Sequence, residues 1–359
     1  MLHRSIGRKK VPREEKNAII PDLIEWFKNT KRQFPWRSPK CTPYAIWVSE
    51  VMLQQTRAEV VVPYFLRWME QFPTIGSLAS ADEDVVIKTW EGLGYYGRAR
   101  RLWQGARFLK ENHAESLPSS YEELLEIPGF GPYTAGAVAS FAFHQKEAAV
   151  DGNVARVMSR LFAIEEDVEK NNTQRLIREL VLGALPDEEP WVAMEALIEL
   201  GALVCKKTPY CHLCPFERVC EAKRLNIVQR LPSKKQKPLS KFLERDVILL
   251  HYEGQVLVRR VQQGQVMAGL YEFPYFERKS QSLEDLLRER FSVDAICQAV
   301  LDPVNQSFTR FRVRLYPSFW ECGEKQAVEG FIWVPLEGLG MLPFSSGHRK
   351  ILPFLRGAL

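Results

Sequence analysis

Four cysteines lie within one short stretch of this chain and constrain its fold more than any other feature. They are Cys205, Cys211, Cys214 and Cys220, in the spacing C-x5-C-x2-C-x5-C. Four thiolates this close in sequence are typical of a metal site, and the spacing alone is compatible with zinc or with a [4Fe–4S] cluster. Disulfide pairing is the alternative, but the other cysteines are isolated and the N-terminus lacks a secretory signal. Because four protein ligands leave no open coordination position, the pattern predicts a structural centre rather than a catalytic one.

The length and composition are typical of a two-domain globular protein. At 359 residues the chain exceeds one ordinary core, and 46% of it is hydrophobic and 26% charged. No apolar run reaches the roughly 20 residues of a membrane span. We therefore expect no membrane contact and an intracellular location, in the cytoplasm or nucleoid. The net charge of +5 is weak evidence for an anionic partner.

Residues 1–225 are dense in helix signals and predict an all-α domain. Thr42 and Pro43 suit an N-cap and a first helical position, and they open a helix expected to run through residue 61. Further helices are expected at 22–30, 62–71, 82–90, 97–112, 121–126, 132–143, 152–162, 173–183 and 191–203. Proline and glycine mark the breaks between them, and strand-like alternation is almost absent.

The pattern changes after this helical part. Residues 226–243 are basic, contain proline and predict a linker. Strand patterns follow at 245–252, 255–261, 310–321 and 330–336, with one helix pattern at 282–291. Residues 244–359 are therefore expected to form a smaller α+β domain.

Gly129 and Gly131 lie between two helix patterns, in the sequence Ile-Pro-Gly-Phe-Gly-Pro-Tyr. Glycine lets the backbone turn tightly, and the N-terminus of the following helix offers free N–H groups to an anion such as a DNA phosphate. A plain turn between helices is the alternative. Pro-Gly-x-Gly between apolar helices favours a DNA-binding motif that resembles a helix-hairpin-helix.

Two carboxyl groups in the helical part are candidates for chemistry. Glu50 falls inside a mostly apolar helix pattern, where burial would raise its pKa and suit it to act as a general acid near neutral pH. An exposed helix edge is the alternative for Glu50. Asp151 follows an apolar segment and precedes a helix pattern, which predicts an N-cap and also a carboxylate held ionised at the lip of a cleft.

Six segments, in order, carry a family resemblance. They are WVSEVMLQQT, EGLGYYGRARRL, IPGFGPYTAGAV, VDGNVARVMSRLF, EALIELGALVC and the four-cysteine loop at 205–220. Together they resemble the MutY adenine DNA glycosylases of the helix-hairpin-helix superfamily, and the C-terminal domain is similar to the Nudix-like domain of that family. The resemblance implies a multidomain fold in which an all-α glycosylase domain, a six-helix barrel plus an iron–sulfur subdomain, precedes an α+β Nudix-like domain. It also implies one [4Fe–4S] cluster on the four cysteines, and we expect a monomer.

The resemblance further implies excision of adenine paired with 8-oxoguanine in double-stranded DNA, after the adenine flips into a cleft. Glu50 matches the acid that protonates adenine N7, and Asp151 matches the carboxylate that stabilises the oxocarbenium-like sugar. Tyr133 and Asn153 match the residues that support this pair. This division of roles suits the chemistry, because adenine leaves only when a ring nitrogen is protonated and its loss leaves positive charge on the sugar.

Other positions match residues of the family's base pocket and DNA contacts. The pocket positions are Arg32, Phe34, Trp36 and Glu195. Gln55 and Tyr95 match residues wedged into the DNA helix beside the lesion. Tyr133 stands where bifunctional relatives such as endonuclease III carry a nucleophilic lysine, so we expect a monofunctional enzyme that leaves an abasic site.

The sequence departs from the family pattern at three places. The first cysteine gap is five residues where the family usually has six, and Lys206 and Lys207 in this gap are candidate phosphate contacts, or else solvated lysines. The family's Phe-Ser-His in the loop that reads 8-oxoguanine is Phe308, Thr309 and Arg310 here, so Arg310 is expected to govern discrimination between 8-oxoguanine and guanine. The acidic cluster of an active Nudix enzyme is missing, so the domain is expected to read the lesion rather than hydrolyse a pyrophosphate.

Two other functions are compatible with parts of the pattern. One is a non-catalytic, mispair-binding iron–sulfur protein, against which the presence of both carboxyl groups argues. The other is a glycosylase of the same superfamily for thymine or uracil in mispairs. Glu50 argues against that target, because thymine has no purine N7 to protonate.

Overall fold

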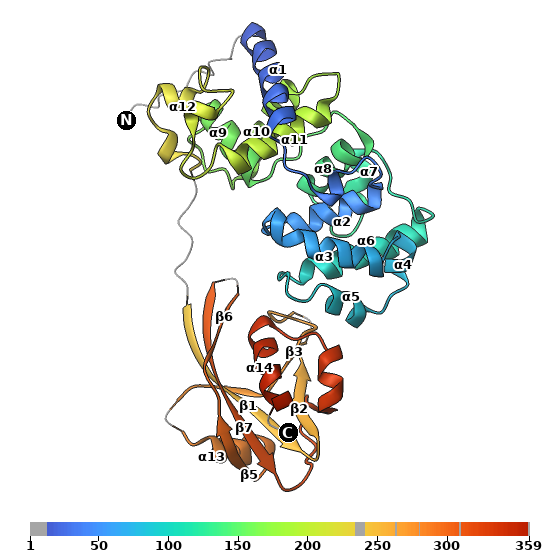
Figure 1. Ribbon diagram of the computed structural model, residues 1–359, viewed down its shortest axis with the longest axis vertical. Coiled ribbons are helices and arrows are strands. Elements are labelled where there is room, and N and C mark those ends of the chain that lie inside the picture. The colour runs from blue at the N-terminus through green and yellow to red at the C-terminus, as the bar shows by residue number, and fades with distance from the viewer. Residues whose placement is uncertain (1–12, 234–240, 263, 280, 309, 358–359) are drawn as a thin grey trace. The chain divides into compact units, whose positions relative to one another are not determined.

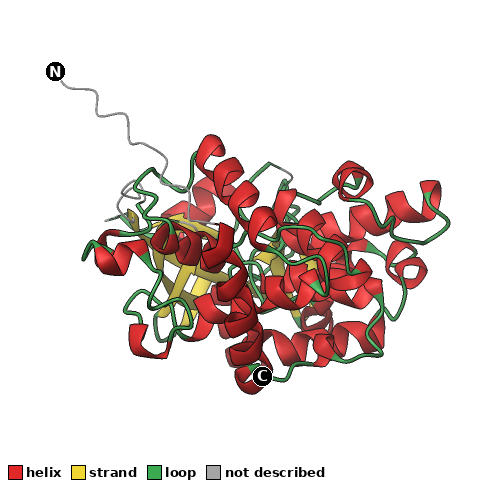
Figure 2. Ribbon diagram, turned by 90° about the horizontal axis from the view of Figure 1, so that it is seen from above, coloured by secondary structure: helices red, strands yellow, loops and turns green. Residues whose placement is uncertain are grey.

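The computed structural model describes residues 13–233, 241–262, 264–279, 281–308 and 310–357 (Figure 1). These residues form two compact units. The first comprises the described residues up to 79 and from 101 to 233, and the second comprises residues 80–100 and the described residues from 241 onward. Figure 2 shows the helices in red, the strands in yellow and the loops in green. No helix in the described part of the chain is long and apolar enough to cross a membrane.

Helices account for all the regular structure that is described between residues 13 and 230. They are α1 (Arg13–Thr30), α2 (Pro43–Leu53), α3 (Ala58–Gln71), α4 (Ile75–Ala79), α5 (Glu83–Thr89), α6 (Gly97–Asn112), α7 (Tyr121–Glu126), α8 (Pro132–Phe143), α9 (Gly152–Leu161), α10 (Asn171–Ala184), α11 (Pro190–Leu203) and α12 (Glu221–Arg224), with short 3-10 turns at Pro35–Arg37, Cys211–Leu213 and Val228–Arg230. The predicted all-α part is confirmed.

One predicted helix is wrong in extent. The helix that opens at Pro43 was expected to continue through residue 61, but α2 ends at Leu53 and α3 starts at Ala58. Gln55 causes the break, because its φ of 58° lies in the left-handed region, which a helix cannot contain. The predicted start is confirmed, since the Thr42 hydroxyl accepts from Ala45 N at 3.2 Å.

Two close backbone approaches position the helices around the site. Gly136 of α8 lies so near the chain that returns from this helix that an added Cβ would stand 2.1 Å from the Ala148 carbonyl oxygen. Gly201 of α11 lies against α9, where an added Cβ would stand 2.6 Å from the Asn153 Cβ. Glycine at these two positions therefore lets α8, α9 and α11 pack side by side.

The second unit contains a mixed sheet whose main path is β3-β2-β1-β7-β5. Its strands are β1 (Lys241–Tyr252), β2 (Gln255–Arg260), β3 (Tyr271–Glu272), β4 (Tyr275–Glu277), β5 (Ala295–Val300), β6 (Val304–Phe308), β7 (Phe311–Cys322) and β8 (Ile332–Pro335). The long central strands β1 and β7 run parallel. Leu287 of α13 (Leu283–Phe291) packs with one apolar cluster of the sheet, and Ile351 of α14 (Ser346–Gly357) packs with the other. The predicted α+β architecture is confirmed.

Candidate active site

A cavity of about 1570 Å³ lies in the first unit. Its walls come from α2, α8, α9, α11 and the segment between α1 and α2. The structure brings twelve of the predicted site residues to this cavity: Arg32, Phe34, Trp36, Glu50, Gln55, Gly129, Gly131, Tyr133, Asp151, Asn153, Glu195 and Lys206. Residues as far apart in the sequence as Arg32 and Lys206 thus line one cavity.

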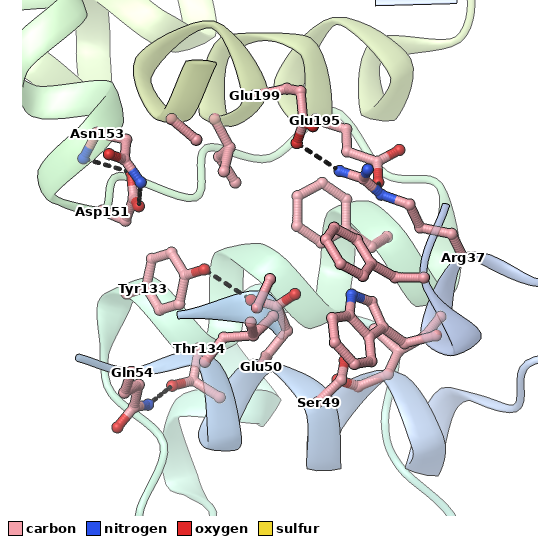
Figure 3. A pocket seen from close by; sticks show the side chains of 18 of the residues that line it. Arg37, Ser49, Glu50, Gln54, Tyr133, Thr134, Asp151, Asn153, Glu195 and Glu199 are labelled. Carbon is pink, nitrogen blue, oxygen red and sulfur yellow. Dashed lines mark hydrogen bonds and ion pairs between the residues drawn. The ribbon is translucent and has the colours of Figure 1, made fainter. Parts of the chain in front are cut away.

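Glu50 is the buried acid of this cavity. Its residue is 6% exposed on α2, and the Tyr133 hydroxyl donates to its Oε2 at 2.6 Å (Figure 3). Burial raises the pKa of Glu50 to about 7, the Tyr133 hydrogen bond opposes the rise, and the charge of Asp151 adds to it. Burial and the neighbouring carboxyl groups raise the pKa of Tyr133 well above its usual value, so its hydroxyl keeps the proton that it donates. Glu50 is therefore buried, not at an exposed helix edge.

Asp151 caps α9 and is held very differently. Its Oδ1 accepts from Asn153 N at 2.9 Å and Val154 N at 2.7 Å, and its Oδ2 accepts from Asn153 Nδ2 at 2.7 Å. Burial raises the pKa of Asp151 above its usual value, but these three donors act in the opposite direction because they stabilise the anion. Glu50 has one donor where Asp151 has three, so the cavity favours a neutral Glu50 beside an ionised Asp151.

Arg156 orients the amide that holds Asp151, and sequence reasoning did not identify it. Its Nη2 donates to Asn153 Oδ1 and to the Gly201 carbonyl, both at 2.8 Å, and its Nε donates to the Cys205 carbonyl at 2.6 Å. With its oxygen engaged, the Asn153 amide presents its NH2 group to Asp151. The position of Arg156 on α9, one helical turn after Asn153, is the feature of the sequence that could have revealed it.

The predicted pocket residues Phe34 and Trp36 form an aromatic wall. Their rings stack at 4.9 Å with an interplanar angle of 10°. Arg32 and Arg37 place their guanidinium groups over the Phe34 ring, at 5.1 and 5.3 Å. A flat base entering the cavity therefore meets a face suited to stacking.

An ion-pair network on α11 completes this wall and includes two residues that the sequence analysis missed. Glu195 is paired with Arg37, and Glu199 accepts from Arg32 Nε at 2.7 Å and Arg37 Nη2 at 3.0 Å (Figure 3). Burial raises the pKa of Glu195 despite its arginine partner. Burial also acts to raise the pKa of Glu199, but hydrogen bonds and charges from two arginines outweigh it and lower that pKa. Glu199 is one helical turn from Glu195, which is the pattern that could have revealed it.

The glycines of the predicted DNA motif join α7 to α8 as expected. Gly129 has a φ of 91°, and an added Cβ would stand 2.7 Å from the Arg101 Cβ, so this position requires glycine. Gly131 is the N-cap of α8 with an extended φ of −121°, and it leaves the first N–H groups of the helix without a side-chain cap.

The predicted wedge residues both have strained backbones. Gln55 is exposed at the cavity with a φ of 58°, and Tyr95 is 53% exposed with a φ of 50°. Non-glycine residues in this region cost free energy and cluster at functional sites. Tyr95 belongs to the second unit, whereas the residues that line the cavity belong to the first. Lys206 and Lys207 are exposed after α11, and only Lys206 lines the cavity.

The four predicted metal ligands are free thiols. Within the described residues, no group of three or more His, Cys, Asp or Glu side chains is arranged to hold one metal ion. Burial, followed by the charges of Cys205, Cys220 and Cys211, raises the pKa of Cys214 to about 12. The Arg160 guanidinium also donates to the Cys205 sulfur at 3.4 Å.

The second unit has its own cavity, of about 310 Å³. Phe308, at the end of β6, lines it and lies 5.6 Å from the Phe311 ring, whereas Arg310 is exposed at the turn between β6 and β7. Thr309 lies outside the described residues. His348 lies at the bottom of this cavity, where burial lowers its pKa to about 3 and its Nδ1 accepts from Phe273 N at 3.0 Å.

Comparison with known proteins identifies both parts of the chain. Residues 48–182 match the HhH-GPD superfamily of base excision DNA repair proteins, and residues 247–353 match the NUDIX domain. The adenine DNA glycosylase of Buchnera aphidicola subsp. Baizongia pistaciae is 31% identical over 280 residues, which are 76% of this chain and 78% of that protein. This chain belongs to the adenine DNA glycosylase family. The adenine DNA glycosylase of Arabidopsis thaliana is 35% identical over 408 residues and covers 95% of this chain, with 64% of that protein covered in return.

A solved structure supports the fold of the helical part. The chain resembles a thermostable thymine-DNA glycosylase with a TM-score of 0.54 at 23% identity, covering 59% of this chain and 98% of that one. At this identity the likeness shows the fold alone. As an adenine DNA glycosylase of the base excision repair class, the chain thus joins a helix-hairpin-helix domain to a NUDIX-like domain, as the sequence predicted.

Proposed function

We propose that this enzyme hydrolyses the N-glycosidic bond of adenine paired with 8-oxoguanine, or with guanine, in double-stranded DNA. The observation that carries the proposal is the pair of carboxyl groups in one cavity, one with a single donor and a pKa of about 7, the other with three donors. Adenine needs an acid and the departing sugar needs an anion, and this pair offers both. Because the proposed substrate is DNA, we expect the enzyme to act inside the cell. We also expect it to be a monomer.

The proposed reaction uses each group in turn. Neutral Glu50 donates its proton to N7 of the flipped adenine, and the C–N bond breaks with its electron pair leaving on the base. Ionised Asp151 stabilises the positive charge that develops on the deoxyribose. Water then adds to the sugar carbon and gives a proton to the Glu50 carboxylate, which leaves an abasic site and restores neutral Glu50. Tyr133 holds the Glu50 carboxyl and Asn153 holds the Asp151 carboxylate. A tyrosine at 133 cannot form a Schiff base, so no strand cleavage is expected.

The remaining predicted residues receive roles in recognition. Arg32, Phe34, Trp36 and Glu195 would contact the adenine. The predicted DNA contacts are Gln55, Tyr95, Gly129, Gly131, Lys206 and Lys207. Phe308, Thr309 and Arg310 would read the base opposite, within a domain at 244–359 that follows the glycosylase domain at 1–225 and the linker at 226–243.

The four cysteines would hold one [4Fe–4S] cluster. Each thiolate of such a cluster binds a different iron, so the four sulfurs need not converge on a single ion as they would for zinc. Four half-buried thiols with mutual charge interactions fit this group. When bound, the cluster would fix the loop that carries Lys206 and Lys207.

The substrate is tested with three duplexes, carrying A opposite 8-oxoguanine, A opposite guanine, and T opposite guanine. After incubation, alkali converts abasic sites to strand breaks. We expect breaks in the two adenine duplexes only. Breaks confined to the T duplex would overturn the substrate assignment, and breaks before alkali would contradict the monofunctional reaction.

A further inference from the structure

The main cavity extends past the base pocket along the full length of α11. The residues of α11 that line it recur every three or four positions: Trp191, Glu195, Ile198, Glu199, Ala202 and Leu203. At 1.5 Å per residue this stripe is about 18 Å long, and one flipped base fills only part of that length. Asn153 lies against Gly201 near the C-terminal end of the stripe, so the catalytic aspartate is at one end and Trp191 is at the other.

The far end of the cavity is a stacked aromatic pair. His144, the C-cap of α8, stacks on Trp191 with ring centroids 4.2 Å apart and an interplanar angle of 22°. Phe141 and Ala142 line the cavity beside them, and Glu195 follows Trp191 by one helical turn. Because His144 is exposed, the cavity reaches the protein surface here as well as at Gln55.

Unusual backbone conformations hold this pair in place. His144 has a φ of 57°, and Glu189, the N-cap of α11 just before Trp191, has a φ of 49°. Neither residue is glycine, so each position costs free energy that the surrounding structure must offset. Glu50 and Asp151 lie elsewhere in the cavity, and His144 and Trp191 have no role in the proposed proton transfer.

Bound DNA would cover the end of the cavity that carries Gln55, Gly129 and Lys206. After cleavage the abasic nucleotide would lie on one side of the free adenine, and the rest of the cavity, towards Trp191, on the other. We propose that the His144–Trp191 end is an exit site, which binds the released, neutral purine base by stacking and lets it leave while DNA remains bound. The identity of the base rests on the proposed function. The aromatic and aliphatic lining suits a flat uncharged ring, since the charge of Glu195, one helical turn from Trp191, is already paired with Arg37.

The test measures equilibrium binding of radiolabelled free adenine to the full chain. The protein is first bound to a duplex that carries a tetrahydrofuran abasic analogue opposite 8-oxoguanine. We expect adenine to bind this complex, Trp191→Ala to weaken the binding about tenfold, and His144→Gly to weaken it a few-fold, as the loss of one stacking face implies. His144→Gly also relieves the backbone strain, so its loss of binding is not a folding defect. His113→Gly is the matched control, because it removes a histidine that packs on Phe108 outside the cavity.

The outcomes separate this proposal from the proposed function. If the wild-type complex binds no adenine, or if Trp191→Ala and His144→Gly bind it as well as wild type, the exit site is wrong even when A:8-oxoguanine duplexes are cleaved normally. If adenine binds and the two variants lose it while no adenine duplex is processed, the proposed function fails and the purine site stands. Adenine that binds only without DNA would also overturn the exit role, because that role requires access with the duplex in place.

Discussion

The cavity in the first unit and the cavity in the second unit hold their ionisable groups in opposite ways. In the first unit, Glu50 is buried with one hydrogen-bond donor, and its pKa of about 7 puts it where a proton can be gained or lost at neutral pH. In the second unit, burial holds His348 neutral with a pKa of about 3, and Glu272 is ion-paired with Arg259. Only the first cavity combines a titrating acid with a nearby anion.

This contrast separates chemistry from recognition. Proton transfer needs a group whose charge changes under working conditions, whereas recognition needs groups whose charge stays fixed. Burying Glu50 lowers the stability of the first unit, because the ionised carboxylate loses its hydration when it is buried. In the second unit, burial also raises the pKa of Glu272, but this carboxyl group is ion-paired with Arg259, and His348 is neutral. A change in the first cavity should therefore affect chemistry, whereas a change in the second unit should affect recognition.

The largest effect is expected from neutralising either catalytic carboxyl group. Glu50→Gln removes the proton donor and Asp151→Asn removes the anion, so each should slow adenine release by about 10²–10⁴-fold. DNA affinity should remain within a few-fold of wild type. Single-turnover excision on an A:8-oxoguanine duplex measures the rate. Glu122→Gln, an exposed glutamate of α7, is the control. Undiminished excision by Glu50→Gln would reject its role as the acid.

The paired glutamate of the same cavity should act on stability instead. The Glu199 side chain is 1% exposed between Arg32 and Arg37, and Glu199→Ala leaves two guanidinium groups without their shared partner. We expect a loss of about 3 kcal/mol in the free energy of unfolding. Glu195→Ala should cost less, because the Glu195 side chain is 28% exposed and has one arginine partner. Urea denaturation compares the two, and equal losses would contradict the ranking.

The pKa of Glu50 predicts a pH-dependent gain in stability when this residue is replaced. The pKa of Glu50 rises on folding from a usual value of 4.5 to about 7. The loss of stability that comes from ionisation of Glu50 is therefore absent below pH 4.5 and largest above pH 7. Glu50→Gln should therefore be about 3 kcal/mol more stable than wild type at pH 8, and less than about 1 kcal/mol more stable at pH 5. Excision by wild type should fall as pH rises through about 7. A stability difference that does not change with pH would mean that Glu50 is not the titrating group.

Much of the fold followed from sequence because local signals agreed with tertiary packing. Thr42 and Asp151 were predicted as N-caps and both accept backbone N–H groups. The break at Gln55 was missed because no glycine or proline marks it. The left-handed conformation there is imposed by the surrounding structure. Strands β3 and β4 were missed because two and three residues are too short to show an alternating pattern, and β5 was missed because most of its residues are exposed. Strand β6 was also not predicted, although it pairs with its sequence neighbour β7.

The site was predictable where a residue carries its own chemistry and not where it acts through a neighbour. Glu50 and Asp151 could be singled out because carboxyl groups among apolar residues are unusual. Arg37, Arg156 and Glu199 were missed, because their importance lies in partners up to 167 positions away, such as Arg32 for Glu199. Sequence alone also could not show that the cavity continues to Trp191.

Glycine substitutions extend the comparison to the DNA-facing rim. Gly129 has a φ of 91°, and an added Cβ would stand 2.7 Å from the Arg101 Cβ. Gly129→Ala should therefore lower stability by at least about 1–2 kcal/mol and weaken DNA binding. Gly254→Ala, in the turn between β1 and β2, has a φ of 74° but no atom within 4 Å of the new Cβ, so it should affect stability alone. Gly131→Ala should be nearly neutral, because its φ is extended and its surroundings are open. Thermal unfolding and DNA titration of the three variants would contradict this order if Gly131→Ala were the most damaging.

The smallest effect should come from the second unit and should leave chemistry untouched. Arg310 is exposed at the turn between β6 and β7, far in sequence from either catalytic carboxyl group. Arg310→His should change the ratio of excision rates on A:8-oxoguanine and A:guanine duplexes by about threefold, which corresponds to less than 1 kcal/mol. The single-turnover rate on A:guanine should stay at the wild-type value, because no proton donor or anion has changed. If both rates fell together, the second unit would contribute to excision itself, and the division between a chemical cavity and a recognition cavity would be wrong.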